Sequence, residues 1–132
     1  MGCSFEFDAV NNILRYCWEG QLTDEVLLNG DATGRKLLAL RPPCKGIQDF
    51  SKVTEFSASS DTIRAIAMMP PAYGVGQAVV FVAPTDVAYG MSRMFVTIGE
   101  KNRPKAHVVR TMAEAYRLLG IDAPQFSPIA LP

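Results

Sequence analysis

The chain has 132 residues, of which 48% are hydrophobic and 20% charged, so it is too apolar for a disordered protein. This length holds one domain with a core of its own, but not two full domains. Thirteen basic and thirteen acidic side chains give a formal charge of zero, which disfavours binding to a nucleic-acid backbone.

The N-terminal segment alternates polar and apolar residues, as strands do. The alternation covers residues 4–8 and resumes over 13–19, with the turn-forming pair Asn11 and Asn12 between the two stretches. The pattern predicts a β-hairpin at the start of the fold.

A helix is expected next, from about Thr23 to Leu40. Thr23 is a suitable N-cap, and acidic residues follow it in the first turn, where the helix dipole favours them. Gly30 and Gly34 weaken this helix, since each glycine costs up to about 1 kcal/mol relative to alanine. Arg41 and the two prolines after it end the helix.

Three strand–helix pairs are expected in the rest of the chain. They are the strand 46–50 with a helix that opens at 57–61 and ends at Pro70, the strand 77–83 with the helix 86–98, and the strand 105–110 with the helix 111–119. The apolar run over 77–83 predicts a strand buried on both faces at the centre of the sheet.

Side-chain spacing predicts which face of the helix 86–98 is buried. The positions expected in the core are Val87, Met91, Phe95 and Ile98, and those expected to point outward are Tyr89 and Arg93. Met94 lies at the margin of the apolar stripe.

The order β-β-α-β-α-β-α-β-α predicts an α/β fold. We expect a mixed five-stranded sheet that begins with the hairpin and carries about four helices, packed mainly on one face. Residues 1–121 are expected to form the domain. Residues 122–132, which contain three prolines, are expected to form an extended arm.

The sequence offers little for catalysis. The only histidine, His107, lies within an expected strand, and no serine elbow accompanies it. Asp49 ends a strand without a partner carboxylate, and Cys44 has only Lys45 beside it to lower its thiol pKa. We therefore expect no catalytic site, no metal and no cofactor.

The remaining sequence features predict where the chain is found. The three cysteines lack the pairing of a disulfide framework and the spacing of a zinc site. No export signal and no membrane span is evident, so we expect a cytoplasmic protein.

Two regions are candidates for binding. The first is the start of the second helix, where Ser57, Ser59, Ser60 and Asp61 lie; these side chains either only cap the helix or also bind an anion at its N-terminus. The second is an apolar groove or partner surface formed by Tyr89, Arg93 and Met94.

The segment Asp49-Phe50-Ser51-Lys52-Val53, followed by a serine-rich helix start, resembles STAS domains, the anti-sigma-factor-antagonist fold. The chain is most similar to the SpoIIAA-like branch, also described as STAS/Sec14-like. The similarity spans roughly residues 4–121 and includes the stretches 5–20, 78–95 and 113–119. In STAS domains an Asp-Ser-Ser/Thr-Gly motif follows, and its first serine is phosphorylated. An ungapped count places that serine at Ala58, so we expect no obligatory phospho-switch.

The resemblance implies a non-enzymatic regulatory module that acts through protein contacts, plausibly in bacterial signalling. Its partner is an unknown protein or a second copy of the chain. The alternative is a binding protein for a small apolar or lipid-like ligand, held between the helix 91–98 and the sheet. An enzyme assembled in a dimer is the third and least favoured hypothesis.

Overall fold

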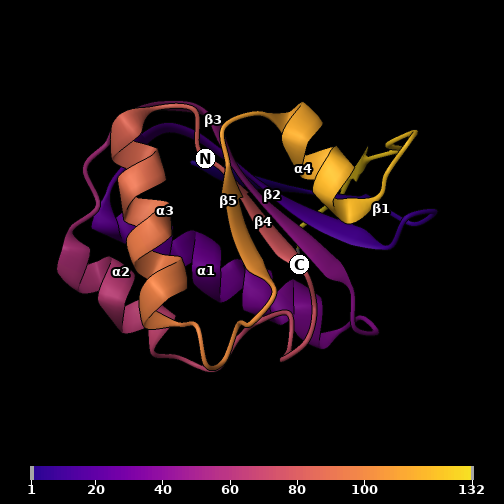
Figure 1. The fold of residues 1–132 in the computed structure, drawn as a ribbon, viewed down its shortest axis with the longest axis horizontal. Helices are drawn as coiled ribbons and strands as arrows, with labels where there is room; N and C mark the ends of the chain where they lie inside the picture. Colours follow the sequence, from indigo (N-terminus) through magenta and orange to yellow (C-terminus); the bar gives the residue numbers. More distant parts are fainter. Residues whose placement is uncertain (1, 132) are drawn as a thin grey trace.

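The computed structural model describes residues 2–131, which form a mixed six-stranded sheet and four helices (Figure 1). In chain order the elements are β1 (Cys3–Asp8), β2 (Ile13–Leu22), α1 (Asp24–Ala39), β3 (Lys45–Phe56), α2 (Ser60–Ala67), β4 (Val79–Val82), α3 (Asp86–Ile98), β5 (Ala106–Val109), α4 (Met112–Leu119) and β6 (Ser127–Pro128). The strand order across the sheet is β5-β4-β3-β2-β1-β6. Strands β2 to β5 are parallel, whereas β1 is antiparallel to both of its neighbours.

The predicted α/β fold and its opening hairpin are confirmed. In the hairpin Cys3 faces Trp18 and Asp8 faces Ile13, and Asn12 takes a left-handed backbone conformation in the turn with φ 59°. Strand β4 lies between β3 and β5 and is buried throughout, as its apolar sequence predicts.

The sheet departs from the sequence-based expectation in two places. It has six strands rather than five, because the two-residue β6 pairs with β1 near the chain end. Strand β3 continues to Phe56, well beyond the expected end at Phe50. The extension forms because residues 52–56 pair with the second half of β2, on the far side of a register shift. Long-range pairing therefore makes a strand where the local sequence indicates a loop.

Alternating side chains divide the interior into two layers. Helices α1, α2 and α3 cover one face of the sheet and pack on the larger core, which includes Leu14, Tyr16 and Trp18 (Figure 1). Helix α4 covers the opposite face, where Ile47, Val80 and other apolar residues form a smaller core. Three helices thus share one face, and the fourth lies on the other. No helix within residues 2–131 is long and apolar enough to cross a membrane.

The helix ends follow the local sequence. The Thr23 side chain accepts from the backbone N–H of Val26 at the start of α1. At α4, Thr111 and Glu114 form the expected capping box, and Gly120 closes the helix in the left-handed region with φ 69°.

The expected burial of α3 is wrong at Val87, which is 56% exposed, and at Tyr89, which is half-buried against the larger core instead of pointing outward. Met91 and Phe95 pack against that core as predicted, and Ala88 and Ser92 are buried. The small side chains of Ala88 and Ser92 let the helix approach the sheet closely, and Phe95 packs beside them on the core. Arg93 points outward, as predicted.

Asp8 joins the hairpin to the C-terminal segment. Its carboxylate accepts from the backbone N–H of Asn11 at 2.9 Å, from Asn11 Nδ2 at 2.7 Å and from the backbone N–H of Gln125 at 2.8 Å. Burial raises the pKa of Asp8, but the hydrogen bonds together lower it by more than burial raises it, so its pKa lies below the ordinary value. Strand β6 then extends the attachment by pairing with Glu6 and Phe7. The segment after residue 121 is therefore tied to the edge of the sheet.

Replacing Asp8 with asparagine should destabilise the protein at pH 7, and the penalty should shrink in acid. A carboxylate whose native pKa is depressed stabilises the fold above its unfolded pKa of about 4, and this contribution is lost as the pH falls through the native pKa. Urea unfolding of both proteins from pH 7 down to roughly pH 2.5 measures the difference. The exposed Asp122→Asn is the control. A penalty that is independent of pH would show that the charge of Asp8 does not contribute.

Candidate functional site

A cavity of about 60 Å³ lies between the sheet and helices α1, α2 and α3, and it is partly open. Its lining is mostly aromatic and aliphatic and consists of Tyr16, Trp18, Leu27, Asp31, Gln48, Phe50, Phe56, Ile63, Ile66, Phe81, Met91, Ser92 and Phe95. The cavity lies within the larger of the two cores, at the place where three helices meet over the middle strands.

The alternation of the strands builds the floor of this cavity. Trp18, Phe50 and Phe81 come from β2, β3 and β4 and lie on the same face of the sheet. Their rings form a row with centroid separations of 6.1 and 6.4 Å and small interplanar angles. Phe95 of α3 reaches Phe81 at 5.2 Å and continues the aromatic wall. The result is a continuous apolar wall of aromatic rings.

A few polar groups interrupt this apolar lining. Trp18 Nε1 donates to Gln48 Oε1 at 2.8 Å, which leaves the amide nitrogen of Gln48 as the other polar end of that side chain. The Tyr16 hydroxyl is buried and has no hydrogen-bond partner within the described residues. Asp31 already accepts from Arg35 Nε at 2.8 Å. An apolar chamber with a small number of polar groups has the general composition of a small-molecule site.

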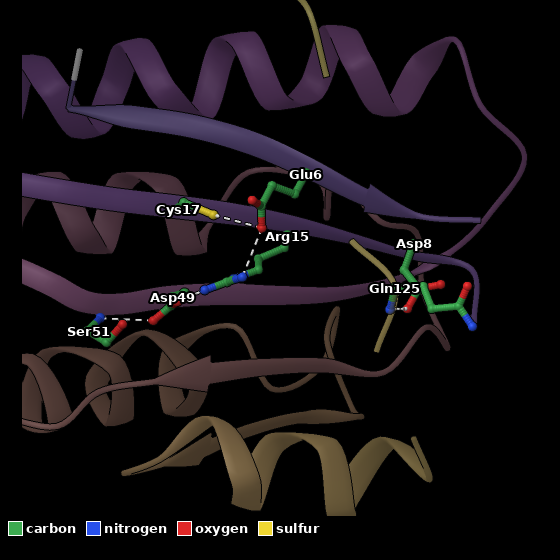
Figure 2. A network of polar contacts seen from close by, with 7 residues as sticks. All are labelled: Glu6, Asp8, Arg15, Cys17, Asp49, Ser51 and Gln125. Carbon is green, nitrogen blue, oxygen red and sulfur yellow. Dashed lines mark hydrogen bonds and ion pairs between the residues drawn. The ribbon is translucent and has the colours of Figure 1, made fainter. Parts of the chain in front are cut away.

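A second polar cluster lies on the opposite face of the sheet (Figure 2). Arg15 of β2 bonds to Glu6 of β1 at 2.8 Å and to Asp49 of β3 at 2.5 Å. The Cys17 thiol donates to Glu6 Oε1 at 3.7 Å. The guanidinium also lies 5.5 Å from the centre of the Phe126 ring in the C-terminal segment.

The charged groups of this cluster are paired with one another, with one guanidinium between two carboxylates. The Asp49 side chain is only 3% exposed and accepts from both Arg15 and the backbone N–H of Ser51. Burial and the nearby carboxylates of Glu6 and Asp49 raise the pKa of Cys17 to about 11, although Arg15 lowers it, so the thiol stays protonated at neutral pH. We interpret the cluster as structural, because both carboxylates bond to Arg15, although the buried Nε of Arg15 has no hydrogen-bond partner within the described residues.

The serines at the second helix have separate roles. Ser59 is the N-cap of α2 and accepts from the backbone N–H of Thr62 at 3.2 Å. Ser57 bonds to the Leu22 carbonyl instead, while Ser60 and Asp61 are exposed. Only one of the four expected residues therefore caps the helix.

A carboxylate from α1 already lies at the start of α2. Asp24 accepts from the backbone N–H of Ser59 at 2.6 Å and from its hydroxyl at 3.2 Å. The bond from the Ser59 N–H is the main reason that the pKa of Asp24 lies below its ordinary value. Ala58, which the ungapped count places at the phosphorylated serine of STAS domains, is buried. The anion site that a phosphate would use is thus filled by the protein's own side chain.

Replacing Ser59 with alanine should lower the free energy of unfolding by about 0.5–2 kcal/mol, the usual cost of a lost helix cap. Chemical denaturation measures it, and Ser60→Ala, one residue on and exposed, is the matched control. A loss well above about 2 kcal/mol would assign Ser59 a role beyond capping and its bonds to Asp24.

The three residues expected to form an apolar groove, Tyr89, Arg93 and Met94, are not part of the cavity lining. Tyr89 lies under the guanidinium of Arg110, 4.1 Å from the ring centre, and Arg93 is exposed. Met94 is half-buried against the larger core. From this helix Met91, Ser92 and Phe95 line the cavity instead.

The remaining candidates for chemistry lie apart from one another. Cys44 is buried, and burial raises its thiol pKa although a backbone hydrogen bond to Leu14 and the charge of Arg41 lower it, so Cys44 is not an activated thiol. His107 is exposed on β5. Within residues 2–131, no three His, Cys, Asp or Glu side chains are placed to hold a metal ion.

Comparison with known proteins adds no relative. Neither the family models nor the curated proteins compared with this chain match it. The resemblance to STAS domains therefore stays a prediction.

The sequence analysis overlooked the polar groups of the cavity. On β3, Gln48 alternates with Gly46 and Phe50 on the face of the sheet that also carries Trp18, so a polar residue on the core-facing side of a strand was the available signal. Gly30 and Gly34 were a second signal. Because glycine has no side chain, Gly30 and Gly34 leave room beneath α1 for the rings of Trp18 and Tyr16. Two glycines four residues apart lie on the same face of a helix, and this spacing indicates a close contact there.

Proposed function

We propose that this protein is a non-enzymatic, STAS-like binding module, and that it holds a small, mainly apolar molecule in the cavity between α3 and the sheet. The observation that supports this proposal is the aromatic chamber described above, which is partly open and has in its wall one buried hydroxyl without a hydrogen-bond partner, that of Tyr16. The cavity lies between residues 91–98 and the strands, where the alternative hypothesis expects a ligand.

The size of the cavity limits the ligand. An engineered apolar cavity of about 150 Å³ in another protein binds benzene or xenon. The enclosed space here is about 60 Å³, so it holds a compact group, while a larger ligand must extend through the open side. A long lipid chain requires movement of α2 and α3, and we therefore favour a small ligand.

Xenon is a suitable probe, since it enters small apolar cavities without needing polar contacts. We expect xenon to shift the methyl NMR signals of Met91, Ile63 and Ile66, which line the cavity. Ser92→Val should fill part of the space and reduce these shifts, because Ser92 is buried in the wall.

The matched control is Thr97→Val, a similar change at an exposed position of the same helix, which should leave the xenon shifts unaltered. Methyl signals that do not respond to xenon in the unmodified protein would contradict the proposed function.

Contact with a protein partner is the second candidate function. Its support is a group of exposed apolar side chains at the ends of α1 and α2, where Leu40 is 79% and Met68 is 72% exposed. The two ends are held together by Arg35, which donates to the Pro70 carbonyl at 2.6 Å.

Native mass spectrometry separates the two candidate functions. A retained small molecule favours the cavity, whereas a bare dimer that Leu40→Lys or Met68→Lys dissociates favours the contact.

A further inference from the structure

The polar groups in the wall define the kind of ligand that the cavity accepts. We propose that the cavity selects a neutral molecule with a small apolar, preferably aromatic, body and one oxygen that accepts a hydrogen bond, and that Gln48 recognises this oxygen. This inference rests on the proposed function and adds the chemical class of the ligand.

The hydrogen bond from Trp18 sets the orientation of the Gln48 amide. An indole N–H only donates, so the Gln48 group that faces it must be the carbonyl oxygen Oε1, at 2.8 Å. The amide NH₂ is then the end of Gln48 that is left to donate to a ligand. Because Gln48 is part of the cavity lining, a bound oxygen acceptor would satisfy this donor.

Tyr16 provides a second polar group beside Gln48. The two residues are direct partners in the β2–β3 register, so their side chains start from neighbouring points on the same face of the sheet. Tyr16 is 1% exposed, and its hydroxyl lacks a partner in the described part of the chain. A buried hydroxyl without a hydrogen bond is costly, and a ligand hydroxyl or carbonyl would relieve that cost.

The charge of the lining favours a neutral ligand. Asp31 is the single ionisable carboxylate of the lining, and its charge is balanced by Arg35 at 2.8 Å. A charged molecule would lose its hydration among the aromatic rings without gaining a free counter-charge. A neutral oxygen needs only the donors that the wall already contains.

Phenol and toluene are matched probes, because they differ mainly in a hydroxyl and a methyl group. Either ring is larger than the enclosed space of about 60 Å³, so part of it must extend through the open side of the cavity. We expect phenol to bind about ten-fold more tightly than toluene in NMR titrations, a preference of about 1.4 kcal/mol. Phenol, but not toluene, should shift the side-chain NH₂ signals of Gln48. A site with polar groups rejects an analogue that leaves them unpaired.

Two variants assign the preference to residues. Gln48→Met, of similar shape, should weaken phenol binding about ten-fold and leave toluene binding within two-fold of the unmodified protein. Tyr16→Phe removes only the Tyr16 hydroxyl, the second polar group, and should reduce the preference for phenol while retaining some of it. It also serves if Gln48→Met does not fold, as judged by its amide NMR spectrum.

The outcomes separate the two proposals. If toluene and phenol bind equally and Gln48→Met leaves the ratio unchanged, the ligand class is wrong while the proposed cavity function stands. If neither probe binds and xenon causes no methyl shifts, the proposed function itself fails. Phenol shifts that appear only at surface residues away from Met91 and Gln48 would also overturn the inference.

Discussion

Replacing Gly34 with alanine should destabilise the protein by about 3 kcal/mol, although alanine is the better helix former. A Cβ at this position of α1 would overlap the hydroxyl and ring of Tyr16, which is 1% exposed. Phe5 packs edge-on against the ring at 4.9 Å and Tyr73 lies at 6.0 Å, so the ring is held on these two sides. Relief therefore requires α1 to move away from the sheet or the Tyr16 ring to shift toward the cavity.

Gly90→Ala is the matched control for this experiment. Gly90 is also within a helix, but an added Cβ meets no atom within 4 Å. This variant should stabilise the protein by about 0.5–1 kcal/mol, because alanine loses less conformational entropy on folding. Urea unfolding of both variants gives the comparison. A Gly34→Ala protein as stable as the unmodified one would show that α1 does not rest directly on Tyr16.

Replacing Arg15 with leucine should cost about 3–5 kcal/mol of folding stability. The change leaves Asp49 buried without its counter-charge, and removal of one partner of a buried ion pair is strongly destabilising. Glu6 loses the same guanidinium but is 28% exposed, so water compensates it better. The double change Arg15→Leu with Asp49→Leu should recover part of the loss, since it removes both charges.

An exposed ion pair provides the comparison for Arg15. Arg110 bonds to Asp86 at 3.0 Å, and the Asp86 side chain is 97% exposed. Asp86→Ala should therefore change the free energy of unfolding by less than about 1 kcal/mol. Equal losses from Arg15→Leu and Asp86→Ala would mean that water reaches Asp49 freely.

Local sequence was sufficient for the helices and their ends. Thr23, Thr111 and Gly120 act through hydrogen bonds to residues a few positions away, so the sequence around them determines the result. The apolar run that became β4 was equally informative, because a short strand buried on both faces needs apolar residues throughout. These features depend little on the rest of the chain.

The features that the sequence did not reveal depend on long-range pairing. Arg15 meets Asp49 because β2 and β3 run parallel in one particular register, and nothing near either residue specifies it. The same pairing extends β3 to Phe56. Similarly, the rotation of α3 about its axis is set by contact with the sheet, which is why Val87 is exposed and Ala88 is not.

The sequence predicts part of the cavity lining. The spacing of Met91 and Phe95 predicts that both side chains face the sheet, but it does not distinguish a packed core from a cavity wall. A void arises from the fit of several elements, and no local pattern of residues encodes it. Helix propensity alone indicates that the glycines of α1 destabilise the helix, but Gly34 is the position where the Tyr16 ring contacts it.

The attachment of the C-terminal segment to Asp8 has a consequence for the order of folding. The bond from Gln125 to Asp8 joins residues 117 positions apart, and its acceptor is held at the end of the hairpin. Closing so long a loop is entropically unfavourable until the hairpin and the parallel strands are in place. The segment should dock after the main barrier has been crossed. Substitutions at this attachment should therefore speed unfolding while leaving the rate of folding nearly unchanged.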